Sequence, residues 1–273
     1  MENLDDSHLD DILCSAVYAG DISSMEHGLV ELTGRCSPVM LPRAIAASIS
    51  TGDIGILQLL LSYCEVDEDV AEAAAVSERV QLVQVILDHG WPIDRELRRG
   101  LIPSVLRQVV IMAVMNVSFS DQLLKLGANP NAESTTGETA LSFALREGTI
   151  NVVGKLLAAG ADVTRGDTLH SASKREPSED TYGLIATLIH RGAPVDAYQW
   201  ENGRAKTIRY GYPQSTALHI ACKEGNYPAA GALLAFGADP RRLKKRGEQL
   251  AAPSPFDLTA PHSDMRRLLE RYM

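Results

Sequence analysis

Apolar residues recur along this chain in short runs at helical spacing, and glycines separate the runs. The clearest example is the segment Thr139–Val163. Its first run contains Leu141, Ala144 and Leu145, and its second run lies just before the last glycine of the segment. Residues at i, i+3 and i+4 lie on one face of a helix. The pattern therefore predicts two short amphipathic helices joined by a glycine turn.

A second segment repeats this pattern closely. Thr139–Val163 reads TALSFALREGTINVVGKLLAAGADV, and Thr216–Pro240 reads TALHIACKEGNYPAAGALLAFGADP. In both, the leucine of T-A-L precedes the first glycine by seven residues and the glycine of G-A-D by 19. These segments resemble the ankyrin repeat, whose signatures are T-P-L-H-x-A and L-L-x-x-G-A-D, although alanine replaces the proline in both.

The physical role of each signature position follows from this resemblance. Thr139 can cap the first helix, and Gly148 and Gly225 let the chain turn back after it. Gly160 and Gly237 then end the second helix in a left-handed conformation. No single helix pair can bury its apolar face, so neighbouring repeats must stack to form a core. We predict an all-α ankyrin-repeat solenoid of stacked helix–turn–helix units with hairpin loops.

Weaker copies of the pattern cover most of the chain. One of them, Asp167–Asp196, contains Thr168-Leu-His-Ser-Ala172, whereas the first and last units are degenerate. The period is irregular from Glu96 to Gln122. We predict a single domain over residues 1–273, with approximate repeats at 8–40, 41–66, 67–100, 101–134, 135–166, 167–210, 211–250 and 251–273.

One hairpin is interrupted by an insertion of roughly a dozen residues, judged by the loop lengths usual between repeats. Gly192 and Leu218 are 26 residues apart, whereas the matching pair Gly127 and Leu141 are 14 apart. The extra residues lie within 197–214, where Asn202-Gly203 favours a tight turn. The insertion holds the aromatic residues Tyr198, Trp200, Tyr210 and Tyr212 and the basic residues Arg204, Lys206 and Arg209.

The insertion permits two interpretations. Aromatic residues and arginine are enriched at binding hot spots, and long loops in compact folds are often functional. The same aromatic residues could instead pack on the neighbouring repeats. Two other segments are interpreted as solvated loops: the polar run Lys174–Gly183 and the run Pro240–Arg246, whose five basic residues could alternatively form a nuclear-import or acidic-partner patch.

The net charge of the 273-residue chain is −9, which argues against general nucleic-acid binding. The charge is unevenly distributed. Residues 1–94 contain 17 acids and 3 bases, so they carry −14, and residues 165–246 contain 13 bases and 8 acids, so they carry +5. A partner that meets the basic part is therefore expected to have an acidic surface.

The cysteines and the N-terminus indicate an intracellular protein. Cys14, Cys36, Cys64 and Cys222 lie far apart and form no Cys-x-x-Cys pair, so we interpret them as reduced thiols. The N-terminus has no basic and apolar signal-peptide pattern. Polar residues and a proline interrupt the most apolar window, so no membrane association is expected. We expect a cytoplasmic or nuclear location.

Residues that could carry chemistry have structural explanations instead. His170 and His219 occupy the T-x-L-H position, where the resemblance implies that histidine braces the turn through hydrogen bonds. Asp162, Asp196 and Asp239 recur at hairpin turns, which indicates turn geometry. The acidic run 65–69 lacks the spacing of a calcium loop. We therefore predict no catalytic residue, no metal and no cofactor.

The leading hypothesis is a non-enzymatic module that binds another protein through its concave face and the insertion. The alternative is an atypical enzyme or small-molecule-binding protein with a pocket under residues 197–214. The oligomeric state is left open. The predicted partner-binding residues are Phe143, Arg146, Glu147, Lys174, Arg175, Tyr198, Trp200, Arg204, Arg209, Tyr210, Tyr212, Lys223 and Glu224.

Overall fold

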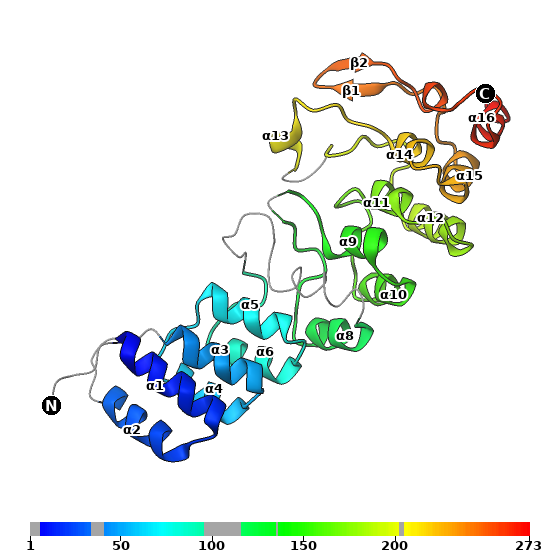
Figure 1. The fold of residues 1–273 in the computed structure, drawn as a ribbon. Helices are drawn as coiled ribbons and strands as arrows, with labels where there is room; N and C mark the ends of the chain where they lie inside the picture. Colours follow the sequence, from blue (N-terminus) through cyan, green and yellow to red (C-terminus); the bar gives the residue numbers. More distant parts are fainter. Residues whose placement is uncertain (1–5, 34–40, 96–115, 135, 202–204) are drawn as a thin grey trace. The chain divides into compact units, whose positions relative to one another are not determined.

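The computed structural model describes residues 6–33, 41–95, 116–134, 136–201 and 205–273, and these residues form helix pairs with one small ribbon of strands (Figure 1). They fall into two compact units. The first holds the described residues up to Arg95 together with Ser118–Ala128, and the second holds Asn129–Met273. The predicted all-α repeat fold is confirmed, and the irregular segment after Glu96 lies mostly outside the described residues.

The first unit contains three described helix pairs and one further helix. The first helices of successive pairs pack on one another, α1 on α3 and α3 on α5, while α4 packs on α6. These elements are α1 (Asp6–Ala19), α2 (Ile22–Thr33), α3 (Pro42–Thr51), α4 (Ile54–Leu61), α5 (Glu68–Val76), α6 (Val80–Asp88) and α8 (Val117–Lys125).

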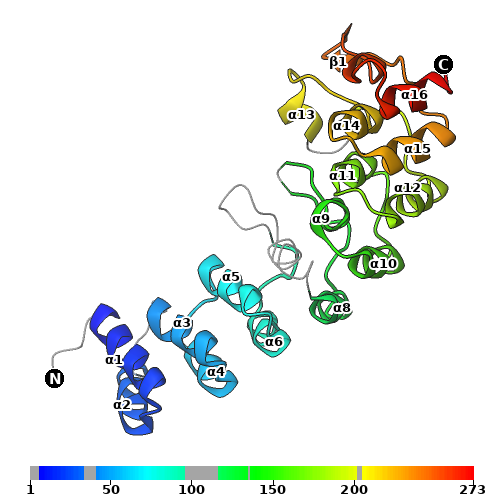
Figure 2. The same cartoon turned by 45° about the vertical axis from the view of Figure 1, so that its right-hand side comes forward.

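The second unit has an inner layer of helices, α9, α11 and α14, and an outer layer, α10, α12 and α15 (Figure 2). A two-stranded antiparallel ribbon and a closing helix follow. The elements are α9 (Ala140–Glu147), α10 (Ile150–Ala158), α11 (Thr168–Lys174), α12 (Asp180–His190), α13 (Ala205–Arg209), α14 (Ala217–Lys223), α15 (Tyr227–Ala235), β1 (Lys244–Arg246), β2 (Gln249–Ala251), η1 (Phe256–Leu258) and α16 (Asp264–Glu270).

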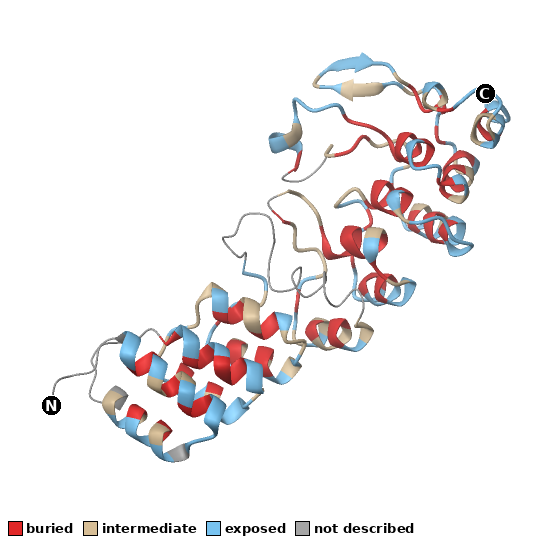
Figure 3. Ribbon diagram, in the orientation of Figure 1, coloured by how far each residue is buried: buried red, intermediate tan, exposed pale blue. Residues whose placement is uncertain are grey.

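The inner helices are buried around most of their circumference (Figure 3). Every residue from Thr168 to Ser173 in α11 and from Ala217 to Cys222 in α14 is buried. An inner helix contacts the preceding repeat, the following repeat and its own outer helix, so polar residues on it must find partners inside the protein. Stacking therefore supplies the core, as the repeat pattern predicts.

The glycines confirm most of the predicted turn chemistry. Gly160 and Gly237 end the outer helices at φ values of 88° and 91°, and Gly225 turns the chain after α14 at 67°. Gly148 is different, because its φ of −89° is open to any residue. A Cβ there would lie only 2.6 Å from the Ala144 carbonyl oxygen, so lack of space and not backbone conformation requires this glycine.

Polar side chains tie the hairpin of one repeat to the next. The Asn131 side chain accepts a hydrogen bond from the Asp162 N–H at 2.7 Å and donates one to the Gly160 carbonyl at 3.0 Å. The Asp196 carboxylate receives the Asp239 N–H in the same way. The carboxylates of Asp162 and Asp239 also accept hydrogen bonds from the backbone N–H groups of the residues two positions later, at 2.8 Å each. The predicted turn role of these aspartates is confirmed.

Candidate functional site

The insertion begins with an anchor, Tyr198, whose side chain is buried. Its hydroxyl donates a hydrogen bond to the Leu243 carbonyl at 2.8 Å, and the Arg242 guanidinium lies 4.8 Å from the centre of its ring. Tyr198 therefore joins the insertion to the next hairpin, and its ring is not available to a partner.

Trp200 is held by a carboxylate that the sequence analysis did not single out. Its backbone N–H donates to both oxygens of Asp167, at 3.1 and 3.0 Å. Burial raises the pKa of the Asp167 carboxyl to about 6, and the bond from the Trp200 N–H offsets part of this rise. Asp167 occupies the threonine position of T-x-L-H, where a helix N-cap is expected, and that position was the available signal for it.

The rest of the insertion is fastened to the ribbon formed by β1 and β2. The Gln214 N–H donates to the Lys245 carbonyl at 2.6 Å, and the Lys245 N–H donates to the Gln214 carbonyl at 3.0 Å. The Arg246 side chain donates to the Gly211 carbonyl at 3.1 Å. The predicted solvated loop Pro240–Arg246 is thus wrong in part, because residues 244–246 form a strand that pairs with β2 and, at Lys245, also with Gln214.

Arg209 is the internal brace of the insertion. Its guanidinium lies 5.2 Å from the centre of the Trp200 ring and 5.6 Å from the centre of the Tyr212 ring. Such cation–π contacts orient the rings without enclosing them. The predicted turn at Asn202-Gly203 and the predicted contact residue Arg204 lie outside the described residues.

Three large apolar side chains of the insertion remain at the surface, and we call them the arm surface: Ile208, Tyr210 and Tyr212. Their exposed fractions are 56%, 53% and 56%. Each of the two interpretations of the insertion therefore holds for a different part of it. Tyr198 packs, Trp200 is partly covered, and the arm surface is held in the open by the packed residues.

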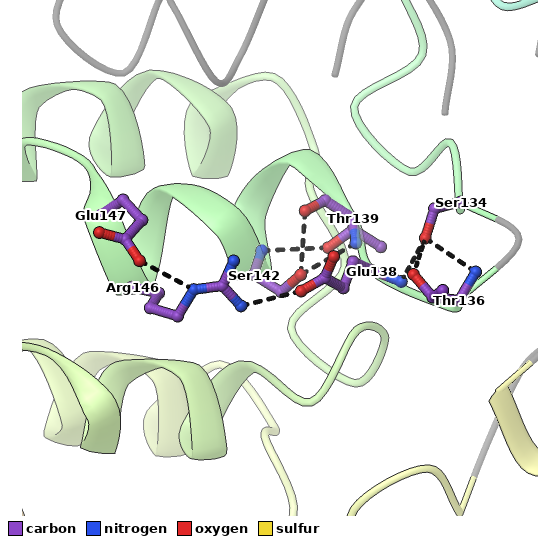
Figure 4. Close-up of polar contacts among 7 residues, drawn as sticks. All are labelled: Ser134, Thr136, Glu138, Thr139, Ser142, Arg146 and Glu147. Atoms are coloured by element: carbon purple, nitrogen blue, oxygen red, sulfur yellow. Dashed lines mark hydrogen bonds and ion pairs between the residues drawn. The ribbon is translucent and has the colours of Figure 1, made fainter. Parts of the chain in front are cut away.

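The inner-helix residues predicted to bind a partner differ in availability. Phe143 is buried, and the Arg146 guanidinium lies 5.2 Å from the centre of its ring. Arg146 also pairs with Glu138 at 2.8 Å and with Glu147 at 3.1 Å (Figure 4). Figure 4 also shows the capping box of α9, in which Thr139 and Ser142 bond reciprocally, as predicted for Thr139. These contacts leave Glu147 as the exposed member of the group.

Arg175 has a structural role that its polar setting in the sequence does not reveal. Its guanidinium donates to the Gly148 carbonyl at 2.5 Å and lies 3.4 Å from the Leu145 carbonyl, so it binds the end of the preceding inner helix. Lys174, Lys223 and Glu224 are exposed, and the last two lie 3.6 Å apart.

The two histidines brace turns as predicted. His219 Nδ1 accepts the Thr216 N–H at 3.1 Å, so Nε2 carries the proton and donates to the Pro253 carbonyl at 3.1 Å. His170 Nε2 lies 3.0 Å from the Ser215 carbonyl. Burial lowers the pKa of each imidazole to about 4. Both rings are therefore neutral near pH 7 and serve as hydrogen-bonding links.

A cavity lies under the insertion, at the place where the small-molecule alternative requires a pocket. Asp167, His170 and Tyr198 line it, but its volume is only about 20 Å³. One water molecule needs about 10–15 Å³, whereas small-molecule pockets measure about 300–1,000 Å³. The cavity therefore accommodates a water and not an organic ligand.

Two features elsewhere bear on other kinds of site. Within the described part of the chain, no cluster of three or more histidine, cysteine or acidic residues could hold a metal ion. None of the described helices combines the length and the apolar character needed to cross a bilayer. Cys14 and Cys222 are free thiols, and Cys36 lies outside the described residues.

Comparison with known proteins agrees with this architecture. The family model "Ankyrin repeat" matches residues 214–245. The chain is 29% identical over 161 residues to the NF-kappa-B p105 subunit of Gallus gallus, which covers 57% of this chain and 15% of that protein. It is 33% identical over 132 residues to the mitochondrial disaggregase of Bos taurus, which covers 48% of this chain and 18% of that protein. The chain thus spans less than a fifth of either relative.

The structural likeness is broader. The ankyrin repeat domain of Bcl-3, described as a unique member of the IkappaB protein family, aligns with a TM-score of 0.57 and 18% identity. The alignment covers 83% of this chain and 97% of that domain. The helix pairs, the braced turns and the structural likeness lead to one conclusion: this chain has the ankyrin-repeat fold, and its residues 214–245 match the ankyrin-repeat family.

Proposed function

We propose that this chain is a protein-binding module that holds its partner through the arm surface and the exposed side chains of the inner helices. Ankyrin repeats in general mediate protein–protein interactions. The fold alone names no partner, so the argument for a binding site depends on particular residues.

The observation that carries the proposal is the exposure of Ile208, Tyr210 and Tyr212 on a segment that is otherwise fastened down. Three contacts fix the segment before any partner arrives: the buried Tyr198, the Asp167–Trp200 bonds and the β-bridge between Gln214 and Lys245. Fixing a loop in advance reduces the entropy lost on binding. Tyrosine on such a support is typical of interface hot spots.

The charges of the same unit favour a protein partner with an acidic surface. Lys206, Arg241 and Arg246 are exposed around the arm surface and the ribbon. Rim charges of this kind mainly raise the association rate and make binding sensitive to salt. The net charge of −9 for the whole chain disfavours nucleic acid as the partner.

We include an intracellular location in the proposal, because Cys14 and Cys222 are free thiols, which persist in a reducing compartment. Within the cell the chain would act by binding and not by catalysis, since the cavity beneath the insertion holds no more than a water molecule.

The test compares two matched triple variants in affinity capture from the native cell extract. The arm variant is Ile208→Ala with Tyr210→Ala and Tyr212→Ala. The control is Ile150→Ala with Tyr182→Ala and Tyr227→Ala, which removes one isoleucine and two tyrosines of 38%, 45% and 42% exposure from the outer helices. Circular dichroism must first show that both variants fold.

We expect a protein captured by the wild type and the control and lost from the arm variant. Equal capture by the wild type, the arm variant and the control would contradict a role of the arm surface in binding. No specific capture with any of them would oppose the protein-binding function itself.

A further inference from the structure

The ribbon beside the insertion has one edge that is paired and one that is open. β1 pairs with β2 in the register Lys244–Ala251, Lys245–Leu250 and Arg246–Gln249. On its other side, β1 pairs with Gln214 through both backbone groups of Lys245. Backbone groups of successive strand residues point to opposite edges. Lys245 therefore directs its backbone away from β2, and its neighbours Lys244 and Arg246 direct theirs toward β2.

The same alternation determines which way β2 faces. Leu250 stands opposite Lys245, so the two form the pair without mutual hydrogen bonds. The N–H and C=O of Leu250 consequently point away from β1, and no group of the described residues hydrogen-bonds to them. All three residues of β2 are exposed, and the Leu250 side chain is 62% exposed. A donor, an acceptor and an apolar side chain thus lie together at an open sheet edge.

Two of the devices that normally protect an exposed edge, charged side chains and proline, are absent from the three residues of β2. Exposed edge strands are usually blocked by charged side chains, especially lysine, or by proline. The sequence of β2 is Gln-Leu-Ala, whereas the basic residues Lys244, Lys245 and Arg246 all lie on β1, the strand that pairs with β2 and, at Lys245, with Gln214. The charges are therefore placed one strand back from the open edge, where they can attract a partner without blocking it.

Side-chain alternation gives the chemistry of a strand that would add to β2. A residue opposite Leu250 shares its face and meets its apolar side chain. The residues before and after it fall opposite Gln249 and Ala251, on the face that Arg246 and Lys244 occupy one strand further on. Lys244 is half-buried, and its side chain is long enough to reach across a strand. Arg246 is exposed, but its Nε donates to the Gly211 carbonyl, so only the two outer nitrogens of its guanidinium remain for a partner. Acidic residues at these two positions complement them.

We infer that β2 is a docking edge for an extended segment of an acidic partner protein, which adds to the ribbon as a strand with the pattern acidic–aliphatic–acidic centred on Leu250. This inference rests on the proposed function and gives it a partner chemistry. The basic residues Arg241, Lys244 and Arg246 and the open backbone of Leu250 select an acidic extended segment over a helix or a second apolar surface. The arm surface adjoins the same ribbon through the Arg246–Gly211 bond, so both contact one partner.

The test is a selection from a displayed library of random twelve-residue peptides on the full chain. We expect enriched peptides to carry an aliphatic residue between two acidic ones. Leu250→Pro removes the outward N–H and leaves the β1 bonds intact, because Leu250 makes none of them. We expect it to weaken binding of the best synthetic peptide about tenfold in fluorescence anisotropy, whereas Leu250→Ala, which keeps the N–H, weakens it about threefold.

A second part of the test reverses charge with the pair Lys244→Glu and Arg246→Glu. The control pair, Arg191→Glu and Arg271→Glu, makes the same charge change at exposed positions on other elements. We expect loss of binding of about tenfold or more only for the first pair. Circular dichroism and near-ultraviolet spectra must match the wild type for each variant.

Several outcomes would overturn the inference. These are enrichment without acidic residues, equal binding by Leu250→Pro and Leu250→Ala, or equal effects of the two charge pairs. Failure here is distinguishable from failure of the proposed function, because the capture experiment changes only the arm surface. A partner captured through Ile208, Tyr210 and Tyr212 could still bind the Leu250→Pro variant equally well. That result would support the protein-binding function and contradict the docking edge.

Discussion

Two hairpins of the second unit show how one fold yields a support in one place and a binding surface in another. The hairpin around Ser134 is held by contacts within itself. The Ser134 hydroxyl accepts a hydrogen bond from the Glu138 N–H at 2.9 Å, and Glu133 forms an antiparallel β-bridge with Thr139. The hairpin that contains the insertion is instead bonded to the next repeat, through the Tyr198 hydroxyl and the β-bridge between Gln214 and Lys245. The longer loop therefore acquires long-range anchors, and those anchors free Ile208, Tyr210 and Tyr212 to remain exposed.

The largest expected effect comes from breaking the anchor of the long hairpin. Tyr198→Ala removes a buried ring and its bond to Leu243, and we expect a loss of about 3 kcal/mol in the free energy of unfolding. Tyr212→Ala, which changes an exposed ring of the same hairpin, should cost no more than about 0.5 kcal/mol. Urea unfolding followed by circular dichroism measures both. Equal costs would contradict the division of the insertion into anchor and surface.

A second prediction concerns the Asp167–Trp200 link. The pKa of Asp167 is about 6 in the folded chain and 3.8 ordinarily, so the folded state binds the proton more tightly. Stability therefore falls as the pH rises from about 4 to about 6, by up to about 3 kcal/mol at 1.36 kcal/mol per pKa unit. Partial solvent access of the carboxyl reduces this to about 1–2 kcal/mol.

Asp167→Asn keeps an acceptor for the Trp200 N–H and removes the titration. At pH 7 we expect it to be more stable than the wild type by about 1–2 kcal/mol, and at pH 3.5 the difference should vanish. Thermal unfolding at the two pH values measures this. A wild type that gains stability relative to Asp167→Asn as the pH rises would show that the bond to Trp200 outweighs burial.

The short hairpin gives a smaller effect. Thr139→Ala removes the hydroxyl that receives the Ser142 N–H at 3.1 Å, and the loss of a helix N-cap costs about 1 kcal/mol. Thr164→Ala, at an exposed turn of the same unit, should cost less, because its hydroxyl bonds only Asp162. Thermal unfolding of the two variants ranks them, and the reverse order would show that the cap of α9 adds little.

The smallest expected effect on stability belongs to the arm surface. The arm variant with alanine at 208, 210 and 212 should differ from the wild type by no more than about 0.5 kcal/mol per residue, since exposed side chains contribute little to folding. A melting curve that drops sharply would mean that these residues support the fold and would contradict their assignment as a free surface.

Much of the repeat architecture could be predicted because its signals are local. The glycine spacing gave the helix pairs and their left-handed ends at Gly160 and Gly237, and the T-x-L-H position of His219 gave its bracing role. Each of these features depends on residues a few positions apart, whose chemistry a sequence pattern displays directly.

The candidate site was less predictable because it depends on pairs that are distant in sequence. Tyr198 and Tyr210 look alike in the same loop, yet one is buried against Leu243 and the other is 53% exposed. Arg175 looks like a surface residue until its guanidinium meets the carbonyls at the end of α9. The β-bridge that fastens the insertion joins Gln214 to Lys245, and neither residue has a local signal for pairing.

The central claim is that the arm surface, and not exposed aromatic area in general, holds the partner. Isothermal titration calorimetry of the captured partner against the arm variant and the outer-helix control tests it directly. The account predicts a loss of affinity of about 100-fold or more for the arm variant, as expected for removal of hot-spot tyrosines, and less than about twofold for the control. Equal affinities for the two variants would contradict it.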